Sequence, residues 1–199
     1  FENLNVYGGN NPIQLNLSKG NKAYFKNVNF YHSNPGFNGV AITGGDLVVF
    51  DNCKANYNDM DGFNHHIGAD SSLPLIIEIN CIGIENGSDK GTAGFKSNNG
   101  TTTHDGVKSI RINGSYGRND GGNVADVNTG TQSWNLGCAA FESYQGKDFQ
   151  TSSGGTMFLD NCIAYGSENS INVVDDTATT YIRMGEYQNK LITGKEVKY

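Results

Sequence analysis

The sequence predicts an all-β chain that coils into a right-handed parallel β-helix, a solenoid of about seven turns. A short motif around an asparagine recurs along the whole chain. Segments rich in β-branched and aromatic residues flank the copies, and no segment shows a sustained helical apolar period. Self-similarity at a period of roughly 20 to 50 residues is typical of stacked repeats, so a solenoid is favoured over a sandwich or a propeller.

The repeat is clearest at the N-terminus, where FENLNVY (1–7) and FKNVNFY (25–31) agree at six of seven positions. The anchor asparagine of this motif occurs at Asn3, Asn27, Asn52, Asn80, Asn113 and Asn161, and Met184-Gly185 take its place once more. The step from Asn3 to Asn27, 24 residues, is taken as the basic turn, and the excess in the longer steps is interpreted as insertions. Because Phe50 stands two residues before its anchor whereas Ile79 stands one before, we expect a one-residue slip at a corner.

The strand-like segments form two sets. Those before an anchor are residues 47–50, 75–79, 107–112, 156–159 and 179–184, and those that follow a polar turn are 39–43, 62–66, 94–97, 123–128 and 171–176. Two or three strands per turn can stack in parallel at asparagine corners, because asparagine tolerates left-handed backbone and its amide can bond the amide one turn above. The solenoid is predicted over 1–189, and residues 190–199 are expected to form a cap or an inter-chain contact.

The composition fits a thin solenoid. Only 36% of the residues are hydrophobic and 27 are glycine, which suits a narrow interior beneath a large surface. The net charge is −6 without a Lys/Arg-rich run, so no nucleic-acid partner is expected. No apolar stretch approaches the roughly 20 residues that span a bilayer, so no membrane insertion is expected. The chain starts inside a repeat, without an initiator methionine or a signal, which suggests a piece of a longer protein.

Three of the four cysteines, Cys53, Cys81 and Cys162, directly follow an anchor asparagine, and the fourth is Cys138. In a stack they would form an internal column, and free cysteine is among the most buried residue types. We therefore expect buried thiols rather than disulfides. The spacings contain no CxxC metal signature, and no metal or cofactor is expected.

The Asn-Cys/Gly turn motif, with an aliphatic or aromatic residue before it, resembles that of right-handed β-helix proteins of the pectate-lyase-like kind. Within this group the chain is similar, over essentially its whole length, to bacteriophage tailspikes and polysaccharide depolymerases. The resemblance implies a homotrimer in the virion tail or outside the cell that binds bacterial surface polysaccharide, often as a hydrolase or lyase. The family shares no single catalytic signature, so the resemblance assigns no catalytic residue.

Unusual polar residues gather in segments 58–70 and 98–108. Aligning 63–65 with 95–97 and 124–126 predicts one column of His65, Ser97 and Asp126, and a neighbouring column of Asn64, Lys96 and Ala125. In the second segment, His104 and Asp105 precede a strand. Adjacent turns lie about 4.8 Å apart, so these side chains would flank a sugar unit; the plainer alternative is packing or hydrogen bonding at corners.

Two cleavage mechanisms fit such a groove. A hydrolase needs two carboxyl groups about 5 to 9.5 Å apart, and the candidates are Asp61, Asp105, Asp126 and Glu142. A lyase acting on a uronic acid needs a base, from His65, His104 or Tyr144, and a cation, Lys96 or Arg118. The histidine-rich set favours the lyase. Sugar contacts are expected from His66, Trp134, Tyr144, Arg118 and Tyr116, with the alternative that Trp134 only covers a groove of the stack.

The leading hypothesis is therefore binding and cleavage of a bacterial surface polysaccharide. The alternative is a non-catalytic glycan-binding or structural shaft. Convergence of four residues in one cleft would favour an enzyme, and their separation would favour a binder; they are His65, His104, Asp105 and Asp126. Zinc binding by the histidines would likewise require that the fold bring them together.

Overall fold

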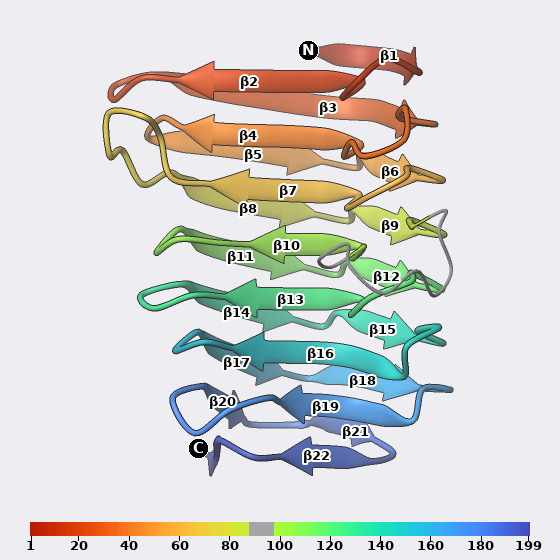
Figure 1. The fold of residues 1–199 in the computed structure, drawn as a ribbon, viewed down its shortest axis with the longest axis vertical. Coiled ribbons are helices and arrows are strands. Elements are labelled where there is room, and N and C mark those ends of the chain that lie inside the picture. Colours follow the sequence, from red (N-terminus) through yellow and green to blue (C-terminus); the bar gives the residue numbers. More distant parts are fainter. Residues whose placement is uncertain (88–97) are drawn as a thin grey trace.

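The computed structural model describes residues 1–87 and 98–199, which form an all-β parallel solenoid of about seven turns (Figure 1). The two ends of the chain lie at opposite ends of the stack. Every pairing between the described strands is parallel, as the repeat predicts. The right-handed sense of the coil stays a prediction from the sequence.

Each turn contributes three strands, which stack into three faces. Face 1 is the eight-stranded sheet of β2 (Ile13–Leu17), β4 (Val40–Gly44), β7 (Phe63–His66), β10 (Thr101–Thr103), β13 (Val124–Val127), β16 (Lys147–Ser152), β19 (Asn169–Val173) and β22 (Lys190–Ile192). Face 2 comprises β5 (Leu47–Asp51), β8 (Leu75–Ile79), β11 (Lys108–Ile112), β14 (Gln132–Leu136), β17 (Thr156–Asp160), β20 (Thr179–Ile182) and β23 (Lys195–Lys198). Face 3 comprises β6 (Lys54–Asn56), β9 (Ile82–Ile84), β12 (Ser115–Gly117), β15 (Ala139–Phe141), β18 (Cys162–Tyr165) and β21 (Gly185–Tyr187).

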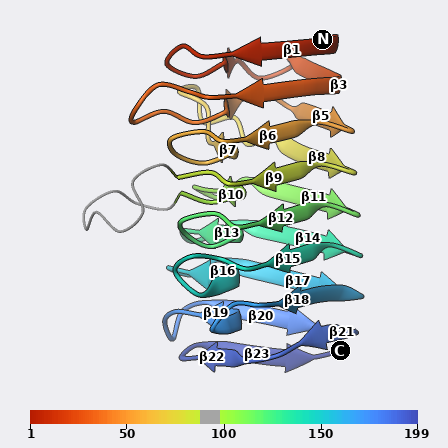
Figure 2. The ribbon, with the colours of Figure 1, turned by 90° about the vertical axis from the view of Figure 1, so that its right-hand side faces the viewer.

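Faces 2 and 3 belong to one continuous sheet because the long strand β3 (Lys22–Tyr31) pairs with both β5 and β6. The first strand, β1 (Glu2–Tyr7), lies on β3 at the N-terminal end. Figure 2 shows these two faces beside each other along the stack. No helix in the described residues is long and apolar enough to cross a membrane.

The anchor asparagines form the corner between faces 2 and 3. Asn27, Asn52 and Asn80 have φ of 53°, 54° and 52°, the left-handed conformation that the sequence predicts. Their side chains bond between turns, since Asn52 Nδ2 donates to Asn27 Oδ1 at 2.7 Å. The expected corner is therefore confirmed.

The long interval between Asn113 and Asn161 is two basic turns, not one turn with an insertion. Gly137 takes the anchor place with φ of 62°, and its N–H donates to the carbonyl of Asp160 one turn on. Glycine adopts this conformation without a Cβ clash, so it substitutes for asparagine there but hides the motif. The strand before it, β14, is therefore absent from the predicted strands, and all four cysteines follow an anchor residue.

The predicted register slip is wrong. Phe50 pairs with Glu78, which pairs with Arg111, so the inward position two residues before the anchor is kept without a break. Ile79 and its partner Ile112 point outward and are half-buried. The interior of the central turns therefore contains charged residues where other turns have phenylalanine or leucine.

A second alignment also needs correction. The face 1 strand between β7 and β13 is β10, in which Thr103 pairs with both His65 and Asp126. The column therefore reads His65, Thr103, Asp126. The residues first aligned there, 94–97, lie outside the described part of the chain.

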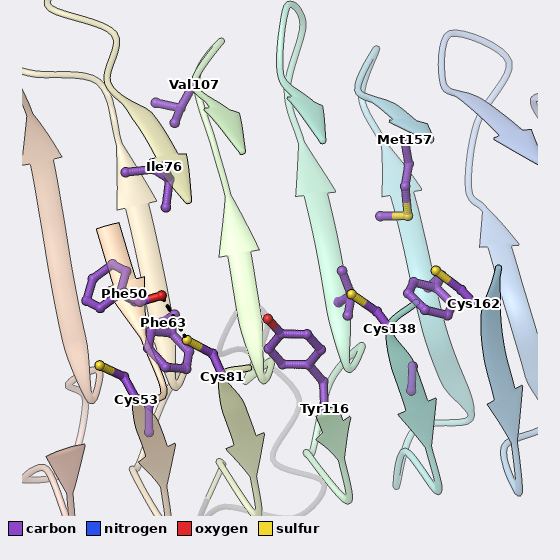
Figure 3. Close-up of a cluster of buried hydrophobic side chains, with 14 of the residues drawn as sticks. Phe50, Cys53, Phe63, Ile76, Cys81, Val107, Tyr116, Cys138, Met157 and Cys162 are labelled. Atoms are coloured by element: carbon purple, nitrogen blue, oxygen red, sulfur yellow. Dashed lines mark hydrogen bonds between the residues drawn. The ribbon is translucent and has the colours of Figure 1, made fainter. Parts of the chain in front are cut away.

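The cysteines are free and buried, as predicted, in a column along the inside of face 3 (Figure 3). Cys53 and Cys81 have Ala55 and Gly83 two residues later, small residues that leave room for each thiol. In the turn of Gly114 the small residue comes first and the large one, Tyr116, comes two residues later. A side chain at Gly114 would not fit, because its Cβ would lie 2.6 Å from the ring of Tyr116. Figure 3 shows that ring between Cys81 and Cys138. Cys-x-small and Gly-x-Tyr thus fill equal lengths of the same narrow core.

Residues 190–199 continue the stack through β22, which pairs with β19, and β23, which pairs with β20. Their role as a cap or an inter-chain contact stays a prediction.

Candidate functional site

A polar cluster lies on the outer side of face 1 around β7, β10 and β13. We call it the outer cluster; it comprises the half-buried residues His66, His104, Asp105 and Asn128 and the buried residues Asp61 and Asn64. His104 follows Thr103 directly, and Thr103 pairs with His65, so His66 and His104 occupy the same place in adjacent turns. Segments far apart in the sequence are thereby brought into contact by the spacing of about 4.8 Å between strands.

The two histidines and Asp105 form one bonded unit. The rings of His66 and His104 are parallel within 5°, with centroids 4.2 Å apart. His66 Nδ1 donates to Asp105 Oδ2 at 2.8 Å, and Asn128 Nδ2 donates to Asp105 Oδ1 at 2.7 Å. The His66 and Asp105 side chains keep 38% and 34% of their surface exposed, so a ligand can reach them.

The environment fixes the charge of two members. Burial acts to raise the pKa of Asp105, but hydrogen bonds from His66 and Asn128 outweigh it and lower the pKa, so this carboxylate is ionised at neutral pH. Burial, followed by the charge of neighbouring His66, lowers the pKa of His104 to about 3. His104 is therefore a neutral ring at neutral pH, and its Nε2 lies 3.5 Å from Asn64 Nδ2.

Asp61 closes the inner edge of the cluster. It is 1% exposed, and it accepts hydrogen bonds from the backbone N–H of Asn99 at 2.7 Å and from Asn64 Nδ2 at 2.6 Å. Burial raises its pKa to about 7 in spite of these bonds. Asp61 thus holds Asn64 in place rather than facing solvent.

Three other predicted residues, His65, Asp126 and Tyr116, point into the interior. With Glu78 and Arg111 they form what we call the lumen cluster, and all five are fully buried. Glu78 lies at the centre: His65 Nε2 donates to its Oε1 at 3.0 Å, and the Tyr116 hydroxyl donates to its Oε2 at 2.6 Å. These residues cannot contact an external polysaccharide.

Arg111 supplies the positive charge of the lumen cluster. Its Nη1 lies 3.4 Å from Asp126 Oδ1, and its Nε lies 3.7 Å from Glu78 Oε1. Burial acts to raise the pKa of Glu78, but the bond from His65 and the charge of Arg111 lower it to about 2. At Asp126, burial prevails over Arg111 and raises the pKa to about 6. Sequence reasoning missed Glu78 and Arg111. These two residues interrupt the apolar column two residues before the anchors, and this interruption, which was interpreted as a register slip, was the signal for them.

Two predicted contact residues, Arg118 and Tyr144, and the candidate carboxyl group of Glu142 lie elsewhere on the surface. Arg118, Tyr144 and Glu142 lie at the corner between faces 3 and 1, where Arg118 Nε is 3.1 Å from Glu85 Oε1 and the Tyr144 hydroxyl donates to Glu85 Oε2 at 3.1 Å. Glu142 follows Arg118 by one turn, since the N–H of Arg118 donates to the carbonyl of Phe141.

Trp134 lies on face 2, away from the outer cluster, and its ring stacks on that of Phe158 with centroids 5.2 Å apart. Lys96 lies outside the described residues. The four residues whose convergence would have favoured an enzyme therefore do not share one cleft. His104 and Asp105 lie on the outer side of face 1, and His65 and Asp126 point into the interior.

A metal centre does not emerge from this geometry. Over residues 1–87 and 98–199, no three His, Cys, Asp or Glu side chains gather in a way that could hold a metal ion. His66 and His104 do come together, but His65, the third histidine of the two polar segments, faces Glu78 in the lumen.

Comparison with protein-family models, with curated proteins and with solved structures found no match. The molecule is an all-β parallel solenoid on the evidence of its own strand pairing. Its function has to be argued from the chemistry of its surface.

Proposed function

We propose that this solenoid binds a polysaccharide on its outer surface at face 1, without cleaving it. The observation that carries the proposal is the half-exposed His66–Asp105 pair, backed by the neutral ring of His104 and the amide of Asn128. An ionised carboxylate and oriented N–H groups beside a flat ring are the groups that hold sugar hydroxyls in place. The stack of parallel strands also offers an elongated surface to an elongated ligand.

Binding is favoured over cleavage because the candidate catalytic groups are divided by face 1. His65 and Asp126 are sealed in the lumen. His104 is a poor general base, since a pKa of about 3 lies far below neutral pH. The resemblance to tailspike proteins is the reason to expect a bacterial surface polysaccharide, and an extracellular or virion-borne setting, as ligand and location.

Hydrolysis is the second candidate, and one observation favours it. The pKa of Asp61 is raised to about 7 while that of Asp105 is lowered, and such a separation is the mark of an acid and base pair. Against it, Asp61 is 1% exposed and already accepts two hydrogen bonds.

The test uses a panel of purified capsular polysaccharides and exopolysaccharides. Retention of the protein in polysaccharide-containing gels measures binding, while new reducing ends and the absorbance of unsaturated uronates measure cleavage. We expect retention by at least one polysaccharide without either product. Asp105→Asn should weaken retention about 10-fold or more, because it removes the ionised acceptor of His66.

The matched control is His32→Ala, which removes an exposed histidine from a different corner and should leave retention unchanged. Equal retention of wild type and Asp105→Asn would contradict the site. New reducing ends that disappear in Asp61→Asn would establish hydrolysis instead, and unsaturated products would establish a lyase.

A further inference from the structure

The outward side of face 2 has a central apolar column along the full length of the stack, with polar and charged residues such as Asp51, Gln132 and Asp160 at its margins. Its central column is continuous through the strand pairing: Tyr24, Val49, Ile77, Ile110, Trp134, Phe158, Tyr181 and Val197. Ile79, Ile112 and Leu136 extend it on one side. By contrast, the outward positions of face 1 include the polar residues Gln14, Asn64 and Gln150.

Face 2 as a whole, with its polar margins, is large: eight strands at about 4.8 Å spacing and five residues at about 3.3 Å rise give on the order of 600 Å² of flat area. The apolar column is a continuous strip within that area. Two such faces in contact would bury about 1,200 Å², the lower limit of standard stable interfaces.

The aromatic residues of the column are arranged for protein packing rather than for sugar stacking. The Trp134 and Phe158 rings are parallel within 1°, and Phe158 and Tyr181 are stacked with centroids 4.7 Å apart. Because these rings cover one another's faces, they present their edges to solvent. A sugar stacks on a ring face, whereas ring edges fit between the side-chain rows of an opposing sheet.

We propose that face 2 is an interface at which this chain packs against the same face of a second copy. The copy's own face 2 is flat, apolar and has side-chain rows at the same spacing, so the two surfaces can pack as a pair of aligned sheets about 10 Å apart. The charged residues of its central strands, Asp51, Lys108 and Asp160, lie at the margins of the face, where their charged ends stay in water. This inference is independent of the proposed glycan site, which lies on face 1.

The experiment measures mass in solution by light scattering and sedimentation over a dilution series of the full chain. The wild type is expected to have twice the chain mass, falling to the mass of one chain on dilution. Ile110→Glu and Trp134→Glu place a charge in the centre of the interface and should each give the mass of one chain, with an unchanged circular dichroism spectrum.

Gln150→Glu adds the same charge to an outward position of face 1 and should behave as the wild type. A wild type with the mass of one chain at every concentration would overturn the inference, as would an Ile110→Glu variant that keeps the wild-type mass. Because Ile110 is only half-buried in the single chain, both face 2 variants are expected to fold. Polysaccharide retention, measured on the two face 2 variants, should not change.

Discussion

Glu78 and Arg111 occupy an inward column in which other turns of the stack have Phe50 and Leu159. Removing two charges from water is expensive, and the cost is met only if every group in the cluster is paired. Arg111 meets that demand, with bonds to Thr103 at 2.6 Å and to Asn135 at 3.3 Å in addition to its carboxylates. All three charged groups of the lumen cluster are thus paired, although His65 Nδ1 is buried without a hydrogen-bond partner. Losing one charged member should therefore cost more than the bonds that it makes.

Arg111→Met should lower the free energy of unfolding by about 3 to 5 kcal/mol, because Glu78 and Asp126 would stay buried without their cation. The control is Arg183→Met, which breaks an exposed pair with Asp160 at 2.8 Å and should cost about 0 to 1 kcal/mol. Urea denaturation followed by circular dichroism measures both. Equal losses in the two variants would mean that the lumen cluster does not stabilise the fold.

His104 should make stability depend on pH. Its pKa is about 3 in the folded chain and 6.5 in the unfolded chain. Between these values the His104 ring is protonated in the unfolded chain but neutral in the folded chain. The stability that this group contributes is present above pH 6.5 and is lost as the pH falls towards 3. His104→Gln removes this dependence, so its urea midpoint should fall less steeply than that of the wild type between pH 6.5 and 4.

His32→Gln is the matched replacement at an exposed corner and should keep the wild-type slope. A His104→Gln variant with the slope of the wild type would show that His104 is protonated in the folded chain at these pH values. Comparing slopes between variants cancels the contributions of the other acidic groups, which all three proteins share.

At the scale of the elements, the short strands of face 3 are interchangeable units that fill one core. The Cys-x-small strands and the Gly-x-Tyr strand β12 place similar volumes at the same depth, with the large group moved by two residues. Since β-strand residues two apart point to the same side, the exchange keeps both groups inside.

A double-mutant cycle tests this exchange. Gly114→Cys alone should destabilise by about 1 to 3 kcal/mol, because its Cβ would lie 2.6 Å from the Tyr116 ring. Tyr116→Ala alone should cost about 3 to 5 kcal/mol through the cavity that it leaves. Together they reproduce the Cys53-x-Ala55 pattern, and the double variant should lose clearly less than the two single losses combined, as measured by urea denaturation. Additive losses would mean that the two sites do not share space.

At the scale of the whole molecule, the three faces have different surfaces, and this is how one solenoid can serve two interactions. Face 1 presents polar groups at the outer cluster, and face 2 presents the apolar column. Oligomer mass and polysaccharide retention should therefore respond to separate sets of substitutions. The proposed pairing of face 2 with itself would give a dimer, whereas the resemblance implies a homotrimer. The homotrimer stays a prediction, and the same mass measurement distinguishes the two.

Much of the fold could be predicted because each part of the repeat uses residue types that favour its local conformation. Asparagine at the corners, cysteine after it and β-branched strands before it define the period and the parallel stack. The turn anchored by Gly137 was missed because glycine adopts the same left-handed conformation as the anchor asparagines but is a different residue in the sequence. The alignment of 94–97 with face 1 failed because a shared phenylalanine is a weak guide to register in a long interval.

The sequence by itself determined the repeat, the corners, the buried thiols and the general region of the polar residues. Only the tertiary structure decided that His66 and His104 stack outside while their neighbour His65 bonds Glu78 inside. The physical reason is the two-residue alternation of a strand: consecutive side chains face opposite sides, and only the pairing register shows which side is the core. His65 and His66 are neighbours in the sequence, but their side chains lie on opposite sides of the sheet.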